Sequence, residues 1–245
     1  EVLSIDRRNK EVQVRNLLDA AVSSYSYDYL VLATGAVPVI PPIIGIQTKG
    51  VCVLRTVEDG IAMKQRAMQS KRISIIGGGF IGLELAEQLS QGGRSVTLFE
   101  ALDRLLPWLP ASYSERVRQT LEEHGIEVFL GTSVSEVQSI EGSVSAVVIN
   151  DGQAVPADMV VLSVGVRPAS ALAREAGLQL GFRDAIVVDA QQRTSDPSIW
   201  ACGDCTQMSH IVSGKPTYIP LGTTANKTGR IAGSVIGGEE VSFPG

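Results

Sequence analysis

The chain has 245 residues, of which 44% are hydrophobic and 19% are charged, and its formal net charge is -5. This composition is typical of a folded chain and argues against disorder. The negative charge gives no reason to expect a nucleic-acid partner. No apolar run reaches the ~18 residues of a membrane span.

The first seventy residues predict short strands, a linker and a helix. Residues 1–16 alternate apolar and polar side chains, as antiparallel strands do. Tyr29–Ala33 is a continuous apolar run closed by Gly35, which predicts a buried strand. Prolines within 38–42 interrupt regular structure and indicate a linker. Residues 56–69 have helical spacing.

From Arg72 onward, the pattern is strand, glycine turn, helix and strand, which is typical of an α/β protein. Gly125 directly follows the helix predicted over residues 111–124 and marks the end of that helix. The predicted strands are 73–76, 95–99, 127–130, 144–150, 159–164, 185–189 and 199–201, and the predicted helices are 83–91, 111–124 and a last one from Thr223 or Thr224 to Ile236.

The strongest motif is the glycine turn at residues 77–82, which has the spacing G-x-G-x-x-G. In a dinucleotide site, Gly77 permits the tight turn, Gly79 lets the backbone approach the pyrophosphate, and Gly82 allows close helix packing. The helix N-terminus then attracts the phosphates. Ile81 lies in the same turn.

An acid at the end of the next strand strengthens this interpretation. Glu100 follows Gly82 by 18 residues, close to the ~20 expected of the acid that binds the adenosine ribose. Its charge favours NADH over NADPH. The glycines could also form a purely structural turn, but the strand before them, the helix after them and the acid favour a dinucleotide site.

Three further segments occur in an order that resembles the pyridine nucleotide-disulfide oxidoreductases, which bind both FAD and NAD(P)H. They are Ala33-Thr34-Gly35, Ser163-Val164-Gly165-Val166-Arg167-Pro168 and Ala201-Cys202-Gly203-Asp204. The resemblance implies that Ala33, Thr34 and Gly35 contact FAD and mark the exit from the FAD domain, and that Gly165 marks the return from the NAD domain and contacts NAD. It also implies that Gly203 and Asp204 contact FAD, with the aspartate on the ribityl chain. Residues 221–230 are similar to a helix start in this family, which would place Thr224 and Ala225 at the flavin, where a threonine could also act as a simple N-cap.

The resemblance implies an α/β fold of two Rossmann-like domains with small antiparallel β elements, the NAD domain being inserted in the FAD domain. The expected domains are 1–54 (FAD), 55–168 (NAD(P)) and 169–245 (FAD, return segment). Because initiator methionine and a closing element are both missing, we expect an internal portion of a longer chain.

Loops at 38–42 and 212–221 look most like the branch of coenzyme A-disulfide reductases, NADH oxidases and persulfide reductases. That branch implies hydride transfer from NAD(P)H to flavin, an acceptor that is a disulfide, a persulfide or oxygen, and a homodimer. Ferredoxin or rubredoxin reductases are the nearest competitors, and a noncatalytic flavoprotein that binds NADH stays open. Within the branch, Phe80 would gate the flavin and Glu84 would orient the nicotinamide, although both residue types are also ordinary at packed or exposed helix positions.

The remaining reactive side chains predict no further chemistry. Cys202 and Cys205 form a C-x-x-C pattern, but they flank the predicted FAD-binding Asp204, whereas this branch carries its redox cysteine much earlier in the chain. The two histidines have no companions at metal-ligand spacing. Only three cysteines are present, too few for a disulfide framework, so we expect a reducing, cytoplasmic compartment and no bound metal.

Overall fold

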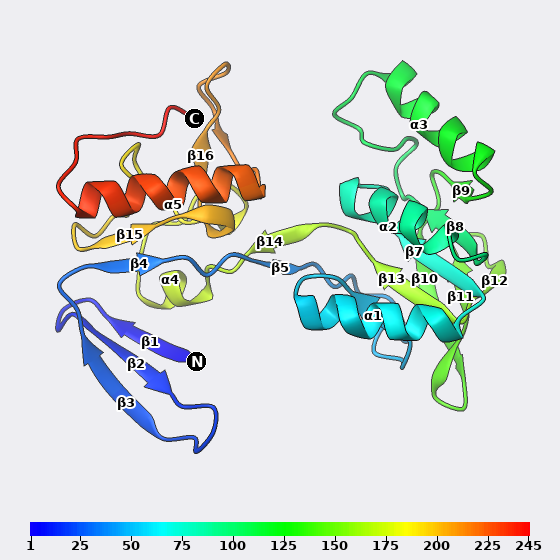
Figure 1. The fold of residues 1–245 in the computed structure, drawn as a ribbon, viewed down its shortest axis with the longest axis horizontal. Helices are drawn as coiled ribbons and strands as arrows, with labels where there is room; N and C mark the ends of the chain where they lie inside the picture. The colour runs from blue at the N-terminus through cyan, green and yellow to red at the C-terminus, as the bar shows by residue number, and fades with distance from the viewer. The chain divides into compact units, whose positions relative to one another are not determined.

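The computed structural model describes all residues, 1–245, and the chain forms two compact units (Figure 1). Unit 1 contains Glu1–Val37 and Val166–Gly245, and unit 2 contains Pro38–Gly165. The second unit is therefore inserted in the first, and the α/β class expected from the sequence is confirmed. No helix combines the length and the apolar character needed to cross a membrane.

Unit 2 is built on a parallel sheet of five strands in the order β6-β13-β7-β8-β9. Its centre is buried, because every residue of β13 is buried, as are the last four residues of β7 and β8. All of these residues except Ser74 and Thr97 are apolar. The strands are β6 (Val51–Val53), β7 (Arg72–Ile76), β8 (Ser95–Phe99), β9 (Glu127–Phe129) and β13 (Met159–Leu162), and the helices are α1 (Val57–Gln69), α2 (Phe80–Ser90) and α3 (Ala111–Glu123).

The two faces of this sheet are covered by different layers. Side chains from all three helices, such as Ala86 and Leu121, pack against one face, which includes Ile75. On the other face, Ile76 packs in one cluster with Val147 of an antiparallel sheet of order β10-β11-β12. These strands are β10 (Val134–Ile140), β11 (Ser143–Ile149) and β12 (Ala154–Pro156). Because both faces are covered, the strands read as continuous apolar runs.

Unit 1 combines several small elements. An antiparallel sheet has the order β1-β2-β3, and β4 and β15 form a parallel pair. Residues of β15 alternate between two cores, so that Ile199 and Ala201 pack with Leu32 while Trp200 packs with Ala232 of the last helix. The elements are β1 (Val2–Asp6), β2 (Glu11–Arg15), β3 (Val22–Ser26), β4 (Leu30–Leu32), β5 (Ala36–Pro38), β14 (Val166–Pro168), α4 (Ala171–Glu175), β15 (Ile199–Ala201), β16 (Met208–Ser209), β17 (Pro216–Thr217) and α5 (Gly222–Ile236), with short 3-10 turns at Phe182–Asp184 and Gly203–Cys205.

Four expectations need correction. Residues 38–54 belong to unit 2 rather than to the first domain, because β6 pairs with β13. Helix α2 begins at Phe80, inside the glycine motif, and not at Leu83. Residues 185–189 form no strand and make only isolated bridges at Ile186. The segment around β4 is less buried than predicted, because β4 has only one strand neighbour, β15. The side chain of Tyr29, for example, is exposed.

Candidate functional site

The glycine turn follows β7, the central strand of the unit 2 sheet. Gly77 has a φ of +109°, and its N–H donates to the carbonyl of Phe99 at 2.8 Å. Ser163 directly follows β13, and its hydroxyl donates a hydrogen bond to the Gly77 carbonyl oxygen at 2.8 Å. A Cβ on Gly77 would meet the backbone oxygen of Ser163 at 2.5 Å. Only glycine fits this position, and the turn is held by the strands on both sides of β7.

The start of α2 is open to a ligand. Its N-cap is Gly79, so no side chain caps the first helical turn. A Cβ built on Gly79 would have no atom within 4 Å, whereas one on Gly82 would overlap the carbonyl oxygen of Gly77. Gly79 therefore leaves space on the outside of the turn, and Gly82 allows close packing on the inside. An uncapped helix N-terminus with space before it suits an anionic group such as a pyrophosphate.

Glu100 lies beside this turn, at the end of β8. Its Oε2 accepts a hydrogen bond from the Gly78 N–H at 2.7 Å, and its Oε1 accepts one from the Leu102 N–H at 2.9 Å. The half-buried carboxylate is thus fixed by two backbone amides. A negative charge held here suits ribose hydroxyls and repels a phosphate on the same ribose.

Gly165 completes the same edge of the sheet on the other side of the turn. It comes shortly after β13 and has a φ of +99°, and a Cβ here would have no atom within 4 Å. Since β13, β7 and β8 are parallel neighbours, Gly165, the glycine turn and Glu100 all follow carboxyl ends at one edge. Ligands of open α/β sheets bind outside this edge.

The outer side of the α2 start is apolar and exposed. Phe80 is 56% exposed, Ile81 is 41% exposed, and Glu84 is exposed one turn later. The Phe80 ring contacts the ring of Trp108, with a centroid distance of 5.3 Å. Trp108 was not predicted as a site residue, because its only signal in the sequence is an aromatic residue among the leucines that follow Glu100.

Unit 1 brings together the residues predicted to hold FAD. Ala33, Thr34 and Gly35 follow β4, and Gly203 and Asp204 follow its parallel partner β15, so both groups lie at one edge of the pair. Gly35 and Gly203 have φ values of +71° and +76°. The hydroxyl of Thr34 donates to the carbonyl of Ala169 at 2.6 Å.

Helix α5 begins against the Gly203 turn. The Gly203 N–H donates to the hydroxyl oxygen of Thr228 at 3.0 Å, and a Cβ on Gly203 would lie 3.5 Å from the Cβ of Ala225. The N-cap is Leu221, without a side-chain cap, so the expectation that a threonine caps this helix is wrong. Thr224 lies in an uncapped first turn, which suits a group that carries negative charge.

The two cysteines beside Asp204 face different cores. Cys202 packs with Trp200 and the α5 residue Ala232, whereas Cys205 packs in the cluster that contains Leu32. The Cys205 thiol lies 3.2 Å from the carbonyl oxygen of Cys202, and burial raises the pKa of the Cys202 thiol. Both side chains are buried thiols in apolar surroundings, which are unreactive.

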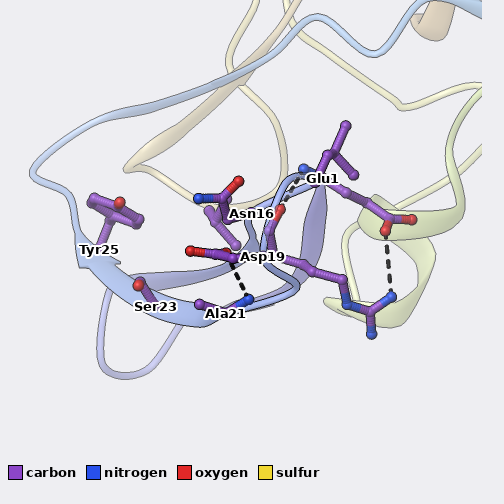
Figure 2. Close-up of a pocket in the computed structure, with 9 residues that line it drawn as sticks. Glu1, Asn16, Asp19, Ala21, Ser23 and Tyr25 are labelled. Atoms are coloured by element: carbon purple, nitrogen blue, oxygen red, sulfur yellow. Dashed lines mark hydrogen bonds and ion pairs between the residues drawn. The ribbon is translucent and has the colours of Figure 1, made fainter.

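A pocket of about 460 Å³ lies on the β1-β2-β3 sheet, and none of the predicted site residues lines it. Figure 2 shows the residues that line this pocket. Its lining includes the ion pair of Arg15 and Glu1 at 3.5 Å and Asp19, whose carboxylate accepts the Ala21 N–H at 3.0 Å. These contacts shape a surface turn and bring together no reactive groups. A smaller pocket of about 280 Å³ in unit 2 is lined by Arg104 and the start of α3.

A parallel sheet with a glycine turn, an uncapped helix and an acid at its carboxyl edge defines unit 2 as a dinucleotide-binding α/β unit. Residues 1–229 match the family described as pyridine nucleotide-disulphide oxidoreductase, and the chain belongs to this family. The resemblance inferred from the motifs is thereby confirmed.

Similar proteins match this chain over nearly its whole length. An NADH oxidase of Methanocaldococcus jannaschii is 38% identical over 99% of this chain and 54% of its own length. The solved structure of a NAD-dependent persulfide reductase from A. fulgidus is 39% identical, with a TM-score of 0.96, over 100% of this chain and 45% of that one. An FAD-dependent pyridine nucleotide-disulphide oxidoreductase structure from Desulfovibrio vulgaris is 36% identical, with a TM-score of 0.92, over 100% and 62%. The chain spans about half the length of the curated relatives it matches.

Proposed function

We propose that this chain is the nucleotide-binding part of a cytoplasmic, homodimeric enzyme that uses FAD to pass electrons from NADH to a disulfide or persulfide. The observation that carries the proposal is the carboxyl edge of the unit 2 sheet. There an open glycine turn, an uncapped α2 and a fixed Glu100 carboxylate meet at one place. Similarity to a NAD-dependent persulfide reductase supports the choice of acceptor.

Unit 2 would hold NADH through groups that are already in place. The first-turn amides of α2 bind the pyrophosphate, because Gly79 leaves the approach free. Glu100 accepts hydrogen bonds from the adenosine ribose, which favours NADH over NADPH. Phe80 covers the nicotinamide position until the cofactor arrives, and Glu84 orients the carboxamide. Gly165 lets the backbone lie close to the cofactor.

Unit 1 would hold part of FAD. Asp204 accepts hydrogen bonds from hydroxyls of the ribityl chain, and Thr224 and Ala225 present the amino end of α5 to the flavin ring. A helix N-terminus stabilises a negative charge by about 0.3–2 kcal/mol. FAD held there would supply the two-electron chemistry that links hydride transfer from NADH to reduction of the acceptor. The phosphates of FAD need a second glycine turn, and the acceptor needs a redox cysteine, both of which we place in the rest of the protein.

Oxygen is the second candidate acceptor, and similarity to the M. jannaschii NADH oxidase supports it. The test uses the full-length protein under anaerobic conditions. NADH should bleach the flavin band, and coenzyme A disulfide, a persulfide and oxygen are then compared as reoxidants. Binding of NADH without bleaching would identify a noncatalytic flavoprotein and refute the proposal.

A pair of variants checks the assignment of Asp204. Asp204→Ala should lose FAD during purification, because an acceptor for the ribityl hydroxyls is removed. Asp28→Ala is the matched control, since Asp28 is an exposed aspartate of the same unit and lies outside the proposed site. Equal flavin content in the two variants would contradict the role of Asp204.

A further inference from the structure

The peptide group between Gly77 and Gly78 is held from both sides by side chains that follow the neighbouring strands. Its carbonyl oxygen accepts a hydrogen bond from the Ser163 hydroxyl at 2.8 Å, and its N–H donates to Glu100 Oε2 at 2.7 Å. Ser163 follows β13 and Glu100 follows β8, which are the two parallel neighbours of β7. A single peptide thus connects a serine on one side of the glycine turn with the acid assigned to the adenosine ribose on the other.

The residues that flank this peptide leave its plane free to rotate. Rotation changes ψ of Gly77 and φ of Gly78, and glycine tolerates the broadest range of both angles. The peptide is trans, so its carbonyl and its N–H point to opposite sides. A rotated peptide would turn the Gly77 carbonyl oxygen toward the Glu100 carboxylate, where two negative oxygen atoms repel each other. The present orientation therefore depends on the hydrogen bonds at its two ends.

The Ser163 hydroxyl is directed at the Gly77 carbonyl. The Ile76 carbonyl oxygen lies 3.1 Å from the same hydroxyl, but it already accepts the backbone N–H of Ser163 at 2.8 Å. The shorter contact, to Gly77, is the one that the hydroxyl proton serves. A peptide whose carbonyl accepts a hydrogen bond is also a stronger donor through its N–H, because hydrogen bonds in a chain polarise one another. The hydroxyl of Ser163 accordingly strengthens the bond that fixes Glu100.

The geometry points to Ser163 as a positioning residue that supports the preference for NADH by fixing Glu100 through this peptide. The inference rests on the proposed function, because it assumes that Glu100 binds the adenosine ribose. Without the hydroxyl, the peptide is held at one end only, and Glu100 keeps one firmly placed amide donor, the Leu102 N–H at 2.9 Å. The carboxylate then binds the ribose hydroxyls less well and is free to turn away from a 2′-phosphate.

The experiment compares Ser163→Ala, which removes one oxygen atom, with Ser163→Thr, which keeps the hydroxyl, and with the control Ser70→Ala. Ser70 is a buried serine of the same unit, and its hydroxyl also donates to a backbone carbonyl, that of Arg66 at 3.0 Å. Because it precedes β7, it lies at the opposite, amino edge of the sheet. All variants are made in the full-length, FAD-loaded protein.

Calorimetry measures the binding of ADP-ribose and of 2′-phospho-ADP-ribose, which differ only in the phosphate on the adenosine ribose. Stopped-flow absorbance measures flavin reduction by NADH and by NADPH. One neutral hydrogen bond corresponds to roughly a 2- to 12-fold change in an equilibrium constant. We expect Ser163→Ala to lower the preference for ADP-ribose over 2′-phospho-ADP-ribose, and for NADH over NADPH, by this factor. The limiting rate of flavin reduction by NADH should stay within about twofold of wild type, because the change affects binding and not hydride transfer.

The other variants separate the hydroxyl from packing and stability. Ser163→Thr and Ser70→Ala should both keep the wild-type preference for ADP-ribose and for NADH. In a Glu100→Ala background, Ser163→Ala should change the preference no further, because Ser163 acts through Glu100.

A wild-type preference in Ser163→Ala, together with an altered one in Glu100→Ala, would overturn the inference and leave the proposed function intact. An altered preference in Ser163→Thr would overturn it as well, since the hydroxyl would not be the cause. Additive effects of Ser163→Ala and Glu100→Ala, or an equal shift in Ser70→Ala, would have the same consequence. Wild-type protein that binds neither ADP-ribose nor NADH would refute the proposed function itself, before any variant is compared.

Discussion

Replacing Gly79 or Gly82 of the glycine turn by alanine should impair different properties of the protein, NADH binding in the first case and stability in the second. A methyl group on Gly79 has no neighbour within 4 Å, and the residue already has a φ of -81°. Its only structural cost is a poorer N-cap, about 0.5–1 kcal/mol. A methyl group on Gly82 overlaps the Gly77 carbonyl oxygen and lies 2.6 Å from the Ser163 hydroxyl, so we expect an overpacking cost of about 1–3 kcal/mol.

Stability and binding should therefore separate in the full-length protein. Since 1 kcal/mol corresponds to about 2–4 °C, Gly82→Ala should lower the Tm by roughly 2–12 °C and Gly79→Ala by less than about 4 °C. Gly79→Ala should nevertheless weaken NADH binding at least about tenfold, because its methyl group blocks one charge-assisted hydrogen bond of about 1.5–3 kcal/mol.

Thermal unfolding and NADH calorimetry on the same preparations measure both effects. Wild-type affinity for NADH in Gly79→Ala would show that no phosphate approaches the turn at this glycine. A wild-type Tm in Gly82→Ala would show that the turn has room on its inner side, against the close packing described for α2.

Glu100→Ala should shift the ratio of kcat/KM for NADH over NADPH by at least about tenfold toward NADPH, since a fixed negative charge beside the ribose is removed; an unchanged ratio would remove Glu100 from this role. Replacing Cys202 and Cys205 together by alanine should leave NADH-dependent flavin reduction intact, and loss of disulfide turnover with FAD still bound would contradict this. A hydrogen bond from its ion-pair partner Arg72 lowers the pKa of the Asp158 carboxyl group to about 2. The contribution of this carboxylate to stability is therefore present above the usual value of 3.8 and is lost as the pH falls toward 2. Asp158→Asn should therefore lose about 1 kcal/mol at neutral pH and show a shallower acid dependence of the unfolding free energy; parallel acid-unfolding curves would contradict it. Residues 38–165 expressed alone should fold and bind NADH, whereas the 245-residue chain should purify without stoichiometric FAD; stoichiometric FAD would mean that the glycine turn was assigned to the wrong cofactor.

Local sequence patterns were sufficient where a strand is buried on both faces. The strand Ser95–Phe99 and the helix of residues 56–69 were predicted close to their observed positions, because the strand-turn-helix-strand pattern and helical spacing are local signals. The same holds for the glycine turn and for Glu100, whose spacing depends on one strand-helix-strand unit.

The errors arose where long-range contacts decide the structure. Three residues, Val51–Val53, form β6 because β13 lies beside them, and nothing in so short a run predicts that partner. Residues 185–189 look like a strand, but only Ile186 finds bridge partners. The contact of Trp108 with Phe80 joins a loop to a helix across 28 positions of sequence, and only the folded chain reveals it.

The two chain connections between the units have a consequence for the evolution of this protein. At the start and end of unit 2, the Val39 N–H donates to the Gly165 carbonyl at 3.0 Å, and on the unit 1 side the Ala169 N–H donates to the Gly35 carbonyl at 2.9 Å. The inserted unit brings its own ends together, so the host closes around it as it would around a short hairpin, and the closure entropy does not grow with the size of the insert. Such a junction permits one nucleotide-binding unit to be exchanged for another, or trimmed and extended within its loops, while the host unit keeps the same two attachment points.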